Sequence, residues 1–282
     1  MMKLIQTVLI CLISAQLFAT AQMPDYLIYN MDTLAIHANP LEAYFEREGL
    51  SDLNAFPELK DCWSTGCWRG YVGFWELRND SIFLNKIVCC SDWYSDTSEQ
   101  ADLQEMFGDK CKNKEVFAYW VSAELIHPEG NQIKYIHQGY DSIYEFERGF
   151  DFVNGILQRT NVYDNTKSKE SIFRTDSLFG FLLQTIDWNL VDELKLEDKK
   201  RVIARFGTDE DGMPIDIEIV RGINMEVDEE ARRVVELIPE WDVYFRRGKV
   251  IETKWVLPIF FDKEFYEEKL LEERRDGSNG EK

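Results

Sequence analysis

The residues of this chain that are best suited to acid–base or metal chemistry are its three histidines, His37, His127 and His137. None of them stands in a metal-binding motif or in a catalytic-triad pattern. His127 and His137 flank a predicted hairpin that would bring them near each other, although exposed side chains are the ordinary expectation. Acidic pairs are abundant, and no spacing singles out two carboxylates as a general acid and base. The sequence therefore predicts no catalytic residue, no cofactor and no metal site, and we expect a protein that is not an enzyme.

The cysteines form the second group of reactive side chains. Outside an apolar N-terminal run there are five of them, all in the first half of the chain: Cys62, Cys67, Cys89, Cys90 and Cys111. An odd number leaves at least one thiol unpaired. Cys89 and Cys90 are adjacent and cannot easily bridge each other, so we expect separate partners. One or two structural disulfides are predicted; the alternatives are unreactive thiols and a zinc site, although no Cys-x2-Cys pair supports the latter.

The N-terminus and the net charge limit where the protein works. Lys3 is followed by a mostly apolar run from Leu4 to Phe18 and by the small-x-small sequence Ala19-Thr20-Ala21. This pattern predicts a signal peptide, residues 1–21, whose removal leaves Gln22 first. We expect a periplasmic or secreted protein with no stable membrane span, and an uncleaved inner-membrane anchor is the alternative. The formal charge of −20 argues against nucleic acid as a partner, since phosphates are repelled.

The predicted fold class is α+β, with a β-rich domain at residues 22–163, a polar linker at 164–175 and a small α/β module at 176–262. In the first domain, hairpin turns are expected at Asn30-Met31-Asp32, Arg78-Asn79-Asp80 and His127-Pro128-Glu129-Gly130. This domain is not placed in a known family. The domain is rich in aromatic residues: Trp68, Tyr71, Phe74, Trp75, Trp93, Tyr94, Tyr119 and Trp120. These side chains are expected in the core, and an exposed platform for sugars or a partner is the alternative.

The second module has an ordered set of signals. A helix near Asp176 is followed by a strand at 201–206, an acidic turn at 209–212 and a strand in which Ile215, Ile217 and Ile219 alternate with charged residues. That alternation predicts one buried and one solvated face. An amphipathic helix ends at Pro239, and a last strand alternates through Ile251, Thr253, Trp255 and Leu257. Residues 263–282 are predicted to be a charged helical or disordered tail.

Residues 201–261 match a family pattern. The helix has the pattern D-x-E-A-x-R-x-V, and an Asp-Gly turn, a Pro-x-Trp corner, a glycine and a Pro-Ile-x-Phe ending occur in order. The residues that carry the match are Gly212, Asp228, Glu230, Ala231, Arg233, Pro239, Trp241, Gly248, Pro258 and Phe261. This segment resembles the C-terminal domain of TonB-family energy transducers. The motif residues themselves are expected to build the fold.

The resemblance implies a binding module of the Gram-negative cell envelope. Proteins of this family present an edge strand to a receptor peptide, which adds to the sheet. By position, that edge corresponds to Lys249, Val250, Ile251, Glu252, Thr253, Lys254 and Trp255. The chain departs from the family because it has no clustered prolines and no permanent anchor once the signal peptide is removed. We therefore expect a protein that binds an envelope protein or a receptor peptide. An atypical anchored transducer for outer-membrane transport, or a glycan-binding or hydrolytic first domain, is the alternative.

Overall fold

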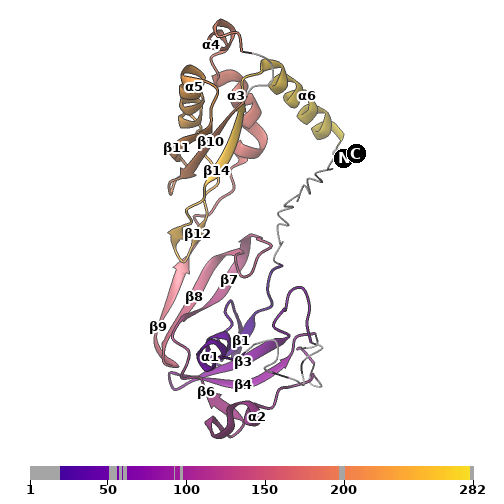
Figure 1. The fold of residues 1–282 in the computed structure, drawn as a ribbon, viewed down its shortest axis with the longest axis vertical. Coiled ribbons are helices and arrows are strands. Elements are labelled where there is room, and N and C mark those ends of the chain that lie inside the picture. Colours follow the sequence, from indigo (N-terminus) through magenta and orange to yellow (C-terminus); the bar gives the residue numbers. More distant parts are fainter. Residues whose placement is uncertain are drawn as a thin grey trace, which may run out of the picture. The chain divides into compact units, whose positions relative to one another are not determined.

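The computed structural model describes residues 20–50, 56, 59, 62–91, 93–95, 98–196 and 201–279 of the chain. The predicted signal peptide lies outside the described residues, except for Thr20 and Ala21. No helix in the described part is long and apolar enough to cross a membrane. The protein is α+β and rich in strands, as predicted (Figure 1). Its residues form two compact units; strands β8 and β9 are divided between them, and β7 belongs to unit 2.

Unit 1 is built on a sheet with the strand order β2-β1-β3-β4. β1 runs antiparallel to β2 and parallel to β3, and β3 runs antiparallel to β4. The bounds of these strands are Asp25–Tyr29 (β1), Asp32–Ile36 (β2), Tyr71–Arg78 (β3) and Ser81–Cys89 (β4). The remaining elements are α1 (Glu42–Glu48), α2 (Leu103–Phe107), the 3-10 turn η3 (Gly108–Lys110), β5 (Cys111–Lys112) and β6 (Glu115–Phe117).

Two of the three predicted hairpin turns are present. Asn30 and Met31 join β1 to β2 with φ of 52° and 70°, and Asn79 and Asp80 join β3 to β4 with φ of 50° and 57°. Two successive residues at positive φ make the two-residue turn that matches the twist of the strands, and asparagine and aspartate tolerate this conformation.

The third predicted turn, His127-Pro128-Glu129-Gly130, is wrong. These residues lie inside the long strand β7 (Glu124–Lys134), which pairs with β8 (Ile143–Val153). β7 is the last strand of its sheet, so the absent N–H of Pro128 is tolerated there. The register shifts after Glu129, which lets the strand continue past Gly130. His127 therefore does not flank a hairpin.

Of the eight aromatic residues expected in the core of unit 1, four are buried, Trp93 and Tyr119 are half-buried and two are exposed. Tyr71 and Trp75 are fully buried, and Phe74 and Trp120 are nearly so. Trp68 and Tyr94, in contrast, are exposed. The ring of Trp120 stacks on Phe107, and its Nε1–H donates to the Pro40 carbonyl at 3.0 Å. The core prediction therefore holds for the strand residues and fails for two loop residues.

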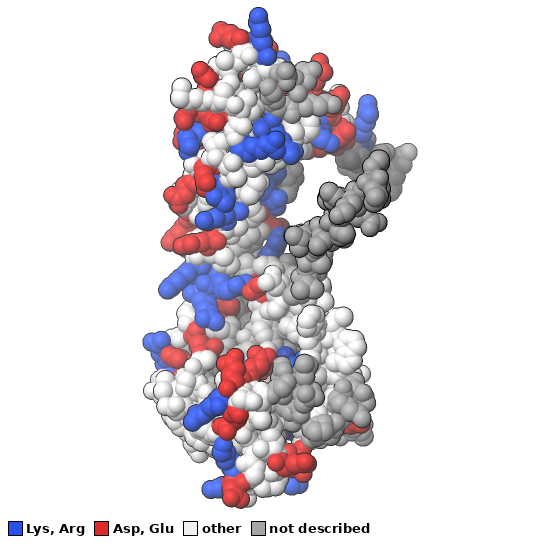
Figure 2. Space-filling model, viewed as in Figure 1, with Lys and Arg blue, Asp and Glu red and all other residues white. Residues whose placement is uncertain are grey.

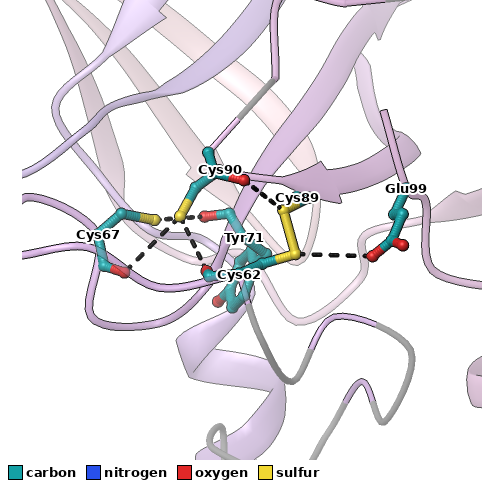
Figure 3. The surroundings of a disulfide bond; sticks show 7 residues. Cys62, Cys67, Tyr71, Cys89, Cys90 and Glu99 are labelled. Atoms are coloured by element: carbon teal, nitrogen blue, oxygen red, sulfur yellow. Dashed lines mark hydrogen bonds between the residues drawn. A yellow bond between two sulfur atoms is a disulfide. The ribbon is translucent and has the colours of Figure 1, made fainter. Parts of the chain in front are cut away.

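Cys62 and Cys89 form a disulfide, and Cys67, Cys90 and Cys111 are thiols (Figure 3). The adjacent cysteines at the end of β4 do not bridge each other, as expected. Figure 3 shows the Cys90 thiol beside the disulfide, and its Sγ lies 3.0 Å from the Cys62 carbonyl oxygen. The disulfide fixes the loop before β3 to the end of β4.

Unit 2 contains all of β7, most of β8 and β9 (Ile156–Asp164), and the residues that follow. Its second sheet has the order β11-β10-β14, and β12 and β13 form a separate hairpin. The strands are β10 (Arg201–Thr208), β11 (Pro214–Arg221), β12 (Phe245–Arg246), β13 (Lys249–Val250) and β14 (Trp255–Phe260). The helices are the π-helical turn η4 (Phe173–Ser177), α3 (Leu178–Thr185), α4 (Trp188–Glu193), α5 (Met225–Glu236) and α6 (Lys263–Asn279).

One hydrophobic core holds this second sheet and its helices together. α5 packs on β10 and β11, so Val227, Ala231, Val234 and Val235 are fully buried against the sheet. Leu182 of α3 and Tyr266 of α6 belong to the same core. The C-terminal helix is therefore present as predicted, but its first turns contribute a fully buried ring.

The segment predicted as a linker, residues 164–175, is packed within unit 2. Asn165 is fully buried; it donates to Glu147 at 2.9 Å and accepts from the Gly248 N–H at 2.9 Å. Ser168 Oγ accepts from the Phe245 N–H at 2.7 Å, and Lys169 bridges Val243. The polar side chains that predicted a linker instead satisfy the backbone of the β12–β13 hairpin.

Candidate functional site

The residues predicted to form one binding strand belong to three different pieces of backbone. Lys249 and Val250 form β13, which pairs with β12. Trp255 opens β14, and residues 251–254 connect the two strands. The Ile251 N–H donates to the Tyr244 carbonyl at 2.8 Å, which keeps this part of the chain with the hairpin. Glu252 and Lys254 are exposed, while Ile251 and Thr253 are half-buried, so the predicted alternation survives in the connecting segment.

An open sheet edge lies directly after this segment. β14 pairs with β10 on one side, and its other side pairs with no strand in the described residues. Successive strand residues direct their backbone polar groups to opposite edges, so Val256, Pro258 and Phe260 share one edge. The Phe260 N–H donates to the Tyr266 hydroxyl at 2.8 Å and not to β10, so this shared edge is the outer one.

The two halves of the outer edge differ. In the C-terminal half, Pro258 has no N–H, and the hydroxyl of Tyr266 occupies the N–H of Phe260. In the N-terminal half, the backbone N–H and C=O of Val256 face outward, and its side chain is 61% exposed. The edge is therefore open to an added strand at Val256 and blocked beyond it.

The opposite edge of the sheet, β11, is irregular. One residue of β10, Phe206, lies opposite two residues of β11, Asp216 and Ile217, and Asp216 has a φ of 53°. This bulge reverses the face of the preceding residue. The predicted alternation is accordingly wrong at Ile215, which is 41% exposed on the face away from α5, while Ile217 and Ile219 pack against the core. A bulged edge offers no regular row of hydrogen bonds.

A groove of about 650 Å³ lies beside the start of β14. One wall is Val250 and residues 252–254, so four of the seven predicted binding residues line it. The other walls are residues 205–210 of β10 and its turn, with Ile215, Asp216 and Glu218 of β11. Pairing between β10 and β14 ends at Phe206 and Trp255, and the groove lies beyond this last pair, on the β10 side of the segment before β14.

Acidic side chains outnumber basic ones in the groove, five to two. Arg205 donates to Glu218 at 2.6 Å, and this hydrogen bond, with the charges of Arg205 and Lys254, lowers the pKa of Glu218. The carboxylate of Asp209 accepts two backbone N–H groups of its own turn. Elsewhere, on the face drawn in Figure 2, acidic and basic side chains are interspersed. The groove is therefore a local excess of negative charge.

Searches with protein-family models, among curated proteins and among solved structures gave no match to this chain in any of the three. The site must therefore be understood from its own geometry.

The motif residues take structural positions. Gly212 has a φ of 87°, and a Cβ there would meet the Trp241 carbonyl oxygen at 2.6 Å. Trp241 is 4% exposed and packs edge-on against Phe206. Glu230 accepts from the Asp187 N–H at 2.8 Å and from Arg233, which also donates to the Thr185 carbonyl. Ala231 and Phe261 are buried, Pro239 follows α5, and Gly248 forms the β12–β13 turn at a φ of 68°.

Sequence reasoning did not identify two residues that shape this module. Asn224 caps α5, because its side chain accepts from the Val227 N–H at 2.9 Å; an asparagine three residues before a helical stripe was the available signal. Tyr266, which blocks half of the β14 edge, lies in the predicted tail and gave no signal. Among the described residues, no group of three or more histidine, cysteine or acidic side chains is arranged to hold a metal ion.

Proposed function

We propose that this protein is an exported, non-catalytic interaction protein of the cell envelope that binds an extended peptide segment of another protein by strand addition. The partner strand would join the sheet at the outer edge of β14. The observation that carries the proposal is the open N-terminal half of that edge. Backbone hydrogen bonds would align the partner strand and supply part of the affinity, and contacts of its alternate side chains would supply the rest and the selectivity.

The order of elements supports a relationship to the TonB C-terminal domain. A helix, a two-stranded hairpin, the amphipathic helix α5 and a last edge strand follow one another, as the sequence resemblance implies. Gly212, Trp241 and Glu230 lie where they support this arrangement. Energy transduction is not part of the proposal, since nothing in the described residues favours it over simple binding.

The test uses the chain from Gln22 to Lys282 and a displayed library of random decapeptides. Selected peptides should bind saturably to the wild-type protein. Val256→Pro removes the outward N–H of the open half-edge, and because Val256 is exposed and its N–H faces away from β10, the fold should persist. Loss of one backbone hydrogen bond, worth about 0.5–1.5 kcal/mol, predicts binding weaker by roughly two- to tenfold.

Val256→Thr is the matched control, because it keeps the backbone N–H and should bind like wild type. Circular dichroism should show all three proteins folded. Equal binding by a folded Val256→Pro variant, or the absence of any saturable peptide, would overturn the proposal.

A further inference from the structure

Two of the free thiols, those of Cys67 and Cys90, lie together in the interior of unit 1. Cys67 is fully buried and Cys90 is 3% exposed, and both belong to one apolar cluster with Val72, Phe74 and Val88. The Cys90 Sγ lies 3.7 Å from the Cys67 carbonyl oxygen, and Figure 3 shows the two side chains pointing toward each other. The hydrogen bond between the two thiols, together with burial, raises the pKa of Cys67.

The backbone explains why Cys90, and not Cys89, faces Cys67. Successive residues of an extended strand point to opposite faces of the sheet, so Cys90 faces the apolar cluster while Cys89 faces away and bonds Cys62. The Cys90 N–H donates to the Gly70 carbonyl at 3.3 Å, which holds the end of β4 against the loop before β3. Each of the two adjacent cysteines therefore has its own cysteine of that loop within reach.

Metal binding does not account for this pair of thiols. A structural zinc site needs four ligands, and no group of three or more histidine, cysteine or acidic side chains is arranged to hold a metal in the described part of the chain. Two buried thiols can serve as small apolar side chains, but an oxidising compartment converts neighbouring thiols to disulfides.

We propose that Cys67 and Cys90 are a site of oxidative modification, at which a second disulfide forms while the protein folds outside the reducing cytoplasm. The proposal goes beyond strand addition and shares with it only the expected export. The oxidant is itself a disulfide, either glutathione disulfide or an oxidised dithiol oxidoreductase. One cysteine thiolate attacks it and releases a thiolate; the second cysteine thiolate then attacks the mixed disulfide and releases the other. Two electrons pass to the oxidant, and the two protons of the cysteines end on its two thiols.

The burial of the pair determines when it can react and what it changes. The nucleophile is the thiolate, so oxidation should be slow once unit 1 has folded around protonated thiols. The new bond would join the same two segments as Cys62–Cys89, so it would close only a short additional loop and add little stability. The number and pairing of the thiols are therefore the measurements that test it.

The test begins with the reduced, denatured chain from Gln22 to Lys282, refolded with reduced and oxidised glutathione and then alkylated with iodoacetamide in denaturant. Mass spectrometry should find a single alkylated cysteine, Cys111. Three alkylated cysteines, with Cys67 and Cys90 among them, would overturn the proposal.

Two variants determine the pairing. Cys62→Ala combined with Cys89→Ala leaves Cys67 and Cys90 in separate tryptic peptides that contain no other cysteine. These peptides should be joined before reduction, and only Cys111 should be alkylated. Cys67→Ala is the matched control, which should keep the first disulfide and leave Cys90 open to alkylation. Alkylation of both Cys67 and Cys90 in a double variant that circular dichroism shows to be folded, or of Cys89 in place of Cys90 in the control, would refute the pairing.

Discussion

Replacement of Asp25 by alanine is expected to destabilise unit 1 by about 4 kcal/mol, because it would leave a buried guanidinium without its anion. Asp25 is fully buried, and its carboxylate accepts from Arg69 Nη2 at 2.8 Å, the Gly73 N–H at 3.0 Å and Trp75 Nε1 at 3.0 Å. The side chain of Arg69 is 4% exposed.

The expected cost of Asp25→Ala depends on which hydrogen-bond partners Arg69 keeps after the substitution. Removing one partner of a buried ion pair costs about 3–5 kcal/mol, a range that includes the donors left without an acceptor. Arg69 keeps the Met23 carbonyl at 2.9 Å and Tyr140 at 3.4 Å, which places the expected cost in the middle of this range. A double variant, Asp25→Ala with Arg69→Met, should be more stable than Asp25→Ala alone, since no charge is then buried unpaired.

Hydrogen exchange of the β3 amides measures this change in unit 1 directly. Amides that exchange through opening of the unit should speed up by roughly three orders of magnitude for about 4 kcal/mol. Asp32→Ala, at an exposed site in β2, is the control and should change stability by less than about 0.5 kcal/mol. A cost below about 1 kcal/mol for Asp25→Ala, or a double variant no more stable than the single one, would refute the reasoning.

Acid and reduction should act on different units. Hydrogen bonds lower the pKa of four carboxyl groups in unit 2, those of Glu145, Asp164, Glu170 and Glu218. These groups stabilise the folded unit above their ordinary pKa values of 3.8 to 4.5, and this stabilisation is lost as the pH falls. Burial raises the pKa of Asp25 in unit 1, so its contribution to the pH dependence of stability has the opposite sign. Amide exchange measured between about pH 6 and pH 3 should therefore show unit 2 opening first. Earlier opening of unit 1 would contradict this. Reduction of Cys62–Cys89, which are separated by 27 residues, should destabilise unit 1 by about 3–4 kcal/mol and leave unit 2 unchanged. A Cys62→Ala/Cys67→Ala/Cys89→Ala variant should be insensitive to the reductant in urea unfolding, and equal sensitivity would show that another bond is being reduced.

Local patterns in the sequence predicted the local features of the fold. Adjacent asparagine and aspartate residues marked the β3–β4 turn because they favour positive φ, and the spacing of Val227, Ala231 and Val234 marked the buried face of α5. The failures depend on distant residues. Pro128 and Gly130 are compatible with either a turn or an edge strand, and pairing with β8 decides in favour of the strand. Likewise, the bulge at Asp216 depends on the register of β11 against β10.

The candidate site was predicted in part for the same reason. The alternation from Ile251 to Leu257 placed a strand near the C-terminus, but the first residue of that strand is fixed by where pairing with β10 ends, at Phe206 and Trp255. The groove lies beyond that last pair, and the limit of the open edge depends on Tyr266 in α6. Neither the end of the β10–β14 pairing nor the Tyr266 hydrogen bond can be recognised in the sequence from Ile251 to Leu257.

The partly blocked edge also limits what affinity the backbone alone can provide. A long edge with a full row of donors and acceptors would pair with many strands, including those of a second copy of the chain. Here Pro258 and Tyr266 restrict pairing to a short stretch around Val256, and charged residues at 252 and 254 precede it. So few hydrogen bonds, each contributing about 0.5–1.5 kcal/mol, are too weak to hold a strand against the entropy of ordering it. Stable binding then requires side-chain contacts with the surface beside this stretch. In this arrangement, protection against indiscriminate pairing and selectivity for a partner have the same structural origin.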